Sequence, residues 1–114
     1  RRPAKAIEEV AEWEDRLKLE LAEALADPGD ESLAEAVDAT NREIEDRLDS
    51  IEAASKAEAS RRAKELAKLN QKVGADVIDE LTAADADEAA REAAYVDAHR
   101  KQARAVAEVL RKIA

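Results

Sequence analysis

Apolar residues recur every three or four positions along nearly the whole chain, which is the spacing of one face of an α-helix. In the first segment this spacing links Ile7, Val10, Leu17, Leu21 and Ala24. Pro28 and Gly29 then interrupt it, and Asp30 is a favourable N-cap for a following helix. The pattern therefore predicts one helix over about residues 3–26 and a second that begins near residue 31.

Beyond Asp30 the helical spacing continues to the end of the chain, and two possible restarts divide it. Capping boxes, in which an N-cap residue is followed three positions later by glutamate, lie at Ser55 and at Asp85. Division at both gives further helices over about residues 31–54, 56–82 and 86–114. Short connections make sequential helices antiparallel, so we expect an all-α, up-down-up-down four-helix bundle in one domain of residues 1–114.

The same stretch also allows a chain of three helices. Residues 31–73 keep the helical spacing without any glycine or proline, so they could form one long helix that Gly74 ends. The first helix would then cover only part of a long hairpin and would leave apolar faces exposed. We favour the four-helix bundle, in which four helices of similar length cover one another.

The composition supports long helices and narrows the range of partners. About a quarter of the residues are alanine, 41% are charged and 2% are aromatic, which is typical of helical rather than sheet proteins. The formal net charge of −9 disfavours binding to nucleic acids or anionic membranes, so we expect neither partner. Such a charge also favours a soluble, monomeric chain. The sequence leaves its localisation open.

Polar and small residues interrupt the apolar face near the middle of the expected bundle. Antiparallel pairing of four equal helices places the following residues at this level or within about one turn of it: Glu14, Thr40, Asn41, Asn70, Gly74, Tyr95, His99, Gln102 and Ala103. A buried polar group without a partner costs about 1–3 kcal/mol, so these groups must satisfy one another or meet a ligand. Because Gly74 and Ala103 leave space beside them, we predict a small-molecule site around His99.

The same residues also have a purely structural interpretation. His99 can form a hydrogen bond with Asn70 or Glu14 without any ligand, and buried asparagines can fix helix register, as they do in coiled coils. A slight rotation of the first helix would turn Trp13 inward and Glu14 outward. The protein would then be a scaffold or assembly module with a self-satisfied polar layer.

His99 also makes haem a candidate cofactor. A neutral imidazole inside a helical bundle is a common axial ligand, and this chain has no methionine or cysteine to compete with it. One histidine without cysteine argues against structural zinc, and Val96 stands where a Glu-x-x-His metal motif would need its glutamate. We assign no catalytic residue. An enzyme could use haem or a Glu14–His99 acid–base pair, so enzymatic activity stays open.

Three short segments give the chain a resemblance to a known class of proteins. They are ADPGDESL at residues 26–33, SKAE at 55–58 and DADE at 85–88. With the surfaces rich in Ala, Glu, Lys and Arg, these segments resemble de novo designed single-chain four-helix bundles, although the two later turns lack the glycine that such designs often use. The resemblance implies an artificial origin. Such bundles have been made as bare scaffolds, as binders of drug-like molecules and as porphyrin proteins, some of them catalysts.

Overall fold

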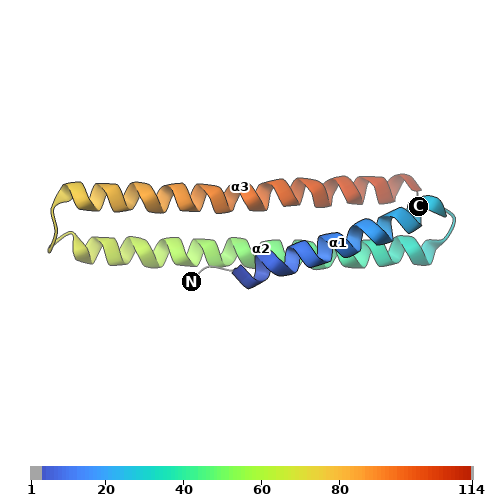
Figure 1. Cartoon of the computed structure of the whole chain (residues 1–114), viewed down its shortest axis with the longest axis horizontal. Coiled ribbons are helices and arrows are strands. Elements are labelled where there is room, and N and C mark those ends of the chain that lie inside the picture. Colours follow the sequence, from blue (N-terminus) through green and yellow to red (C-terminus); the bar gives the residue numbers. More distant parts are fainter. Residues whose placement is uncertain (1–3, 114) are drawn as a thin grey trace.

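Three helices and two turns make up residues 4–113, the part of the chain that the computed structural model describes. Helix α1 spans Ala4–Ala26, α2 spans Glu31–Leu69 and α3 spans Ala75–Ile113. Helices α2 and α3 form a long antiparallel hairpin, and α1 lies along one half of it (Figure 1). The result is a rod of about 66 × 19 × 16 Å. Within the described residues there is no strand, so the all-α prediction is confirmed.

The four-helix bundle is wrong, and the three-helix alternative is the arrangement observed. Ser55 and Asp85, the expected N-caps, lie inside α2 and α3. A capping residue starts a helix only where the backbone leaves helical geometry, and no glycine or proline near either position forces it to do so. A continuous helix also keeps the backbone hydrogen bonds that two new helix ends would lose. Asp85 instead pairs across the hairpin, with its Oδ2 3.1 Å from Nε of Arg62.

The turn between α1 and α2 follows the sequence prediction. Helix α1 ends at Ala26, and Asp30 precedes α2 in an extended conformation. Its Oδ1 accepts hydrogen bonds from the backbone N–H of Ser32 at 2.9 Å and from the Ser32 hydroxyl at 2.6 Å. These bonds favour the ionised carboxyl and lower the pKa of Asp30 below its ordinary value. The predicted N-cap is confirmed.

The turn between α2 and α3 lies at the far tip of the hairpin. The N–H of Asn70 donates to the carbonyl of Leu66 at 3.0 Å and closes α2, and α3 begins directly after Gly74. Because α2 continues past Ser55, residues 56–69 extend away from α1 instead of folding back along it. The expectation that Asn70 and Gly74 share a level with His99 is therefore wrong.

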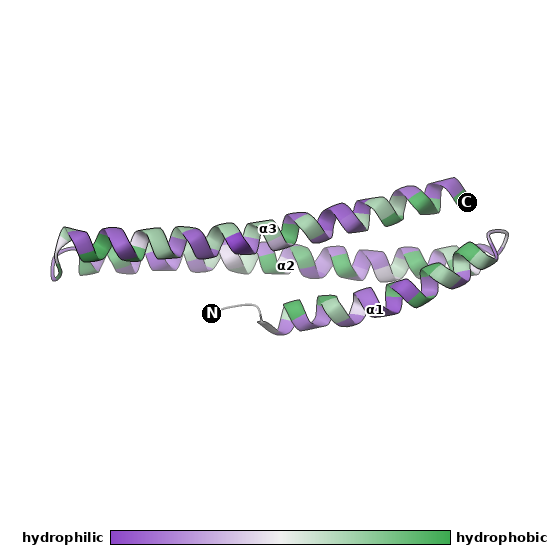
Figure 2. Ribbon diagram, turned by 45° about the horizontal axis from the view of Figure 1, so that its top comes forward, coloured by the Kyte–Doolittle hydropathy of each residue, from purple (hydrophilic) through white to green (hydrophobic). Residues whose placement is uncertain are grey.

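The hydrophobic core lies where α1 covers the hairpin. The apolar side chains buried together there are Val10, Leu17, Ala24, Val37, Ile44, Leu48, Ile51, Val96 and Leu110. Residues 53–94, called here the distal hairpin, follow Ile51 and precede Tyr95, both of which belong to or pack against the core. In this part the hairpin extends beyond the end of α1 (Figure 2). Among the described residues of this segment, only Leu66 is buried. Stability from apolar burial is therefore concentrated at the α1 end of the rod.

Candidate functional site

A histidine–glutamate pair connects α1 with α3. Nδ1 of His99 lies 2.5 Å from Oε2 of Glu14, and each side chain keeps only about a fifth of its surface exposed. With Glu14 as a carboxylate, the Nδ1–H donates this bond, which leaves Nε2 as the nitrogen available to a ligand. The pair fixes the orientation of the imidazole, in the way that carboxylates orient metal-binding histidines.

Tyr95 packs against the imidazole from one helical turn earlier on α3. The two ring centroids lie 4.2 Å apart, and the ring planes are inclined by 35°. Burial of the phenol, and to a lesser extent the nearby Glu14 charge, raises the pKa of Tyr95 above its ordinary value. Tyr95, His99 and Glu14 therefore form one connected group with restricted side-chain freedom.

Asn41 brings a buried amide from α2 to the same level. Its side chain is only 3% exposed, and its Nδ2 donates to the backbone carbonyl of Ala103 at 2.9 Å. Its Oδ1 has no hydrogen-bond partner among the described residues. A buried acceptor left in this state costs about 1–3 kcal/mol, and buried amides in folded proteins are normally satisfied. Asn41 is thus half satisfied: its buried Oδ1, called here the open acceptor, has no hydrogen-bond partner among the described residues.

A pocket of about 310 Å³ lies between the three helices beside these groups. Its lining residues are Glu14, Leu17, Lys18, Leu21, Asn41, Ile44, His99, Gln102, Ala103 and Val106. Half of them are apolar, and the others offer a carboxylate, an ammonium, two amides and an imidazole. A few polar groups within an apolar lining are characteristic of small-molecule sites, and this volume lies at the small end of their range.

The structure brings together most of the residues predicted for the site. Glu14, Asn41, His99, Gln102 and Ala103 all line the pocket, and Tyr95 packs against His99. Thr40 is buried next to Asn41, but its hydroxyl donates to Glu20 of α1, so it is already satisfied.

Asn70 and Gly74 are the two predicted site residues that lie elsewhere, at the tip of the hairpin. Their placement depended on a third helix that turned back at residue 55. Both are exposed. Neither residue lines the pocket beside His99.

Two features of the site were missed from the sequence. Lys18 lines the pocket one helical turn after Glu14, and its position on the same face of α1 could have indicated this. The guanidinium groups of Arg16 and Arg47 both lie over the Trp13 ring, at 5.0 and 5.1 Å from its centroid. Trp13 and Glu14 are both half-buried, so the orientation of α1 turns both side chains partly inward.

No cluster of three or more metal-ligating side chains occurs among residues 4–113. This does not test haem, which needs one axial histidine. The described helices also include none that is long and apolar enough to cross a membrane. No protein-family model matches the chain, and no curated protein or solved structure matches it either. The resemblance to designed bundles stays a prediction.

The ionisation of Tyr95 gives a testable pH dependence. Because the folded-state pKa is raised above the ordinary value of 10.0, the unfolded chain loses the phenol proton first as the pH rises. Stability from this group is therefore complete below pH 10 and falls as the pH rises through the folded-state pKa. Phenolate absorbance in a pH titration should show a midpoint above that of the unfolded chain. In Glu14→Gln the midpoint should move part of the way back, and an unshifted midpoint in the native protein would contradict this environment.

Proposed function

We propose that the pocket between α1, α2 and α3 binds a small organic molecule that has an apolar body and at least one N–H or O–H donor. The open acceptor on Asn41 carries this proposal. A donor from the ligand would satisfy Oδ1 and remove the cost of burying it unpaired. The apolar body would lie against Leu17, Ile44 and Val106, which line the same pocket.

The charged and aromatic groups at the pocket favour recognition over simple core packing. His99 is held by Glu14 through Nδ1, so its other nitrogen remains for a ligand. Lys18 and Gln102 add donors at the exposed side of the pocket. A scaffold with a self-satisfied polar layer would not need an open acceptor, which is why we place the scaffold interpretation second.

Haem binding is a narrower form of the same proposal. The Glu14 carboxylate would orient His99 as an axial ligand. A porphyrin is larger than a pocket of about 310 Å³ can hold, so α1 would have to move away from α3. We therefore place a smaller organic ligand ahead of haem.

The support for an enzyme based on the Glu14–His99 pair is weaker still. The pair has the chemistry of a general base with its orienting carboxylate. However, no hydroxyl or thiol lines the pocket among the described residues, so nucleophilic catalysis through serine, threonine or cysteine has no candidate there.

A pair of probes tests the donor requirement directly. Indole and N-methylindole share an apolar body, but only indole has an N–H donor. We expect indole to bind about two- to twelvefold more tightly to the native protein, because one hydrogen bond contributes about 0.5–1.5 kcal/mol. In Asn41→Leu the preference should disappear, while the ligand-free protein becomes more stable by about 1 kcal/mol. Calorimetric titration and denaturant unfolding measure the two effects.

Further variants separate the alternatives. Ala103→Leu should fill the pocket, raise the stability of the free protein and abolish indole binding. If it strongly destabilises the protein, the space is already packed and the scaffold interpretation holds. A Soret band that appears on haem titration and is absent in His99→Ala would favour the porphyrin form. Equal affinity for both indoles in the native protein, or none for either, would reject the proposed donor-bearing ligand.

A further inference from the structure

Charge is segregated between the two helices of the distal hairpin. On α2, residues 53–69 contain five basic and two acidic side chains, a net charge of +3. On α3, residues 75–94 contain one basic and seven acidic side chains, a net charge of −6. One helix of this segment is thus a basic strip and its neighbour an acidic strip along the full length of the distal hairpin.

Much of this complementary charge is not used within the chain. Arg62 pairs with Asp85 across the hairpin. Lys64 and Lys68 on α2 are exposed and form no ion pair within the described residues, and the same holds for Asp79 and Asp87 on α3. A second surface with acidic and basic strips in the opposite order would be needed to pair them.

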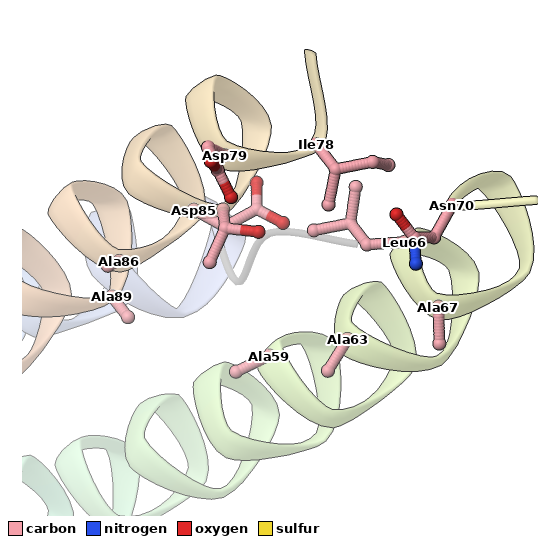
Figure 3. A pocket seen from close by; sticks show the side chains of 11 residues that line it. Ala59, Ala63, Leu66, Ala67, Asn70, Ile78, Asp79, Asp85, Ala86 and Ala89 are labelled. Carbon is pink, nitrogen blue, oxygen red and sulfur yellow. The ribbon is translucent and has the colours of Figure 1, made fainter. Parts of the chain in front are cut away.

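Between the two strips runs a shallow groove, called here the alanine groove because five of its eleven lining residues are alanine. The lining side chains are Ala59, Ala63, Leu66, Ala67, Asn70, Ile78, Asp79, Thr82, Asp85, Ala86 and Ala89, around a space of about 570 Å³ (Figure 3). Ala59, Ala63 and Ala67 follow at intervals of four, so they share one face of α2. Small side chains on both walls allow another helical surface to approach closely.

The alanine groove faces away from α1. On α2 the side that faces α1 is marked by Arg47, whose Nε lies 3.7 Å from Glu9 of α1. Ala63 follows Arg47 by 16 residues, which at 3.6 residues per turn places it about 160° around the helix. Outside the groove and nearer to α1 along the hairpin, Arg100 pairs with Asp49 and Glu52 of α2, and within the described residues it forms no ion pair with α1. A partner can therefore occupy the groove without displacing α1.

We propose that two copies of this chain pack through their alanine grooves, with the hairpins parallel, to form a four-helix bundle along the distal hairpins. A two-fold axis along the rod places α2 of one copy against α3 of the other, so each basic strip meets an acidic strip. An antiparallel pair would place α2 against α2 and would bring two basic strips together. The charge pattern thus selects the parallel arrangement.

The ion pairs expected at this interface follow from the register of the hairpin. Arg62 and Asp85 lie at one height, because they pair directly. Lys68 is six residues after Arg62, and Asp79 is six residues before Asp85, so these two also share a height on antiparallel helices. A two-fold axis along the rod preserves height. Lys68 of one copy therefore lies level with Asp79 of the partner subunit, on both sides of the dimer.

The available area predicts a dimer of moderate strength. The helices of the distal hairpin are about 25–30 Å long. With a rod width of 19 Å, one face offers roughly 500 Å² and two copies together roughly 1,000 Å², the lower limit for a specific interface. The dimer should therefore dissociate on dilution. This inference does not depend on ligand binding at His99.

Sedimentation analysis of the full chain up to millimolar concentration, with two charge-reversed variants, tests the proposal. One variant carries Lys64→Glu and Lys68→Glu, and the other carries Asp79→Lys and Asp87→Lys. We expect the native chain to dimerise, each variant alone to stay monomeric at concentrations where the native chain is dimeric, and an equimolar mixture of the two to form heterodimers. Circular dichroism should show native helicity in both variants.

Other outcomes would overturn the parallel dimer. They are a native chain that is monomeric throughout, variants that dimerise as well as the native chain, or a mixture that stays monomeric. Tighter self-association of the Lys64→Glu, Lys68→Glu variant would instead indicate an antiparallel pair.

The apolar part of the interface has its own matched test. Ala63→Glu places a charge in the alanine groove and should abolish dimerisation at every concentration used. Ala11→Glu makes the same change at an exposed position of α1, outside the groove, and should leave the dimer intact. Equal dimerisation of the two variants would show that copies do not meet through this groove.

Discussion

Lys56→Pro is expected to lower the free energy of unfolding by about 3 kcal/mol or more, or to unfold the distal hairpin outright. Residue 56 lies in the interior of α2, where proline removes a backbone hydrogen bond and its ring clashes with the carbonyl of residue 52. If Ser55 capped a new helix, residue 56 would be a first helical position, where proline is tolerated. Far-ultraviolet circular dichroism and denaturant unfolding measure the loss of helix and of stability.

Glu31→Pro is the matched control for this substitution. Residue 31 is the true first residue of α2, and Asp30 before it is already extended, as a residue before proline prefers to be. Its effect should stay within about 0.5 kcal/mol. Similar stability of the two proline variants would contradict a continuous α2.

Leu48→Ala is expected to cost about 2–5 kcal/mol of unfolding free energy. Leu48 is fully buried at the level where α1, α2 and α3 all meet, so removal of its side chain leaves a cavity that the rigid helices cannot close. The midpoint of denaturant unfolding should fall without a change in its slope.

Leu19→Ala makes the same chemical change on the outer face of α1, where Leu19 is 71% exposed. It removes almost no buried contact, so the change in stability should lie within about 0.5 kcal/mol. A cost at Leu48 no larger than that at Leu19 would mean that α1 does not cover the hairpin as described.

The helical class and the first turn could be predicted because each depends on local chemistry. Pro28 and Gly29 cannot continue a helix, and Asp30 caps the next one, so the boundary near residue 31 depended on no distant contact. Ser55 and Asp85 are different, because a capping side chain permits a helix start without requiring it. Where no glycine or proline interrupts the helix, one continuous helix keeps more backbone hydrogen bonds than two separate helices would. The sequence cue at these positions was therefore insufficient.

A site residue could be placed from the sequence when its position did not depend on the number of helices. Tyr95, Gln102 and Ala103 lie near His99 because all four belong to α3, where spacing alone sets their proximity. Glu14 and Asn41 lie on α1 and α2 beyond a correctly placed turn, so their heights were right as well. Asn70 and Gly74 were assigned through the turn at residue 55 that does not exist. The open acceptor on Asn41 depends on side-chain geometry, which spacing does not give.

The tip of the hairpin is far from the pocket, so other sequences can be inserted there without blocking it. Along α3, residues 75 and 99 are separated by about 36 Å, so the turn at residues 70–74 is far from the pocket. Exposed turns of small and polar residues tolerate insertions well. A peptide epitope or a second folded domain joined there would leave the pocket unobstructed, and parallel pairing of two copies would display two such cargoes side by side at one end of the rod.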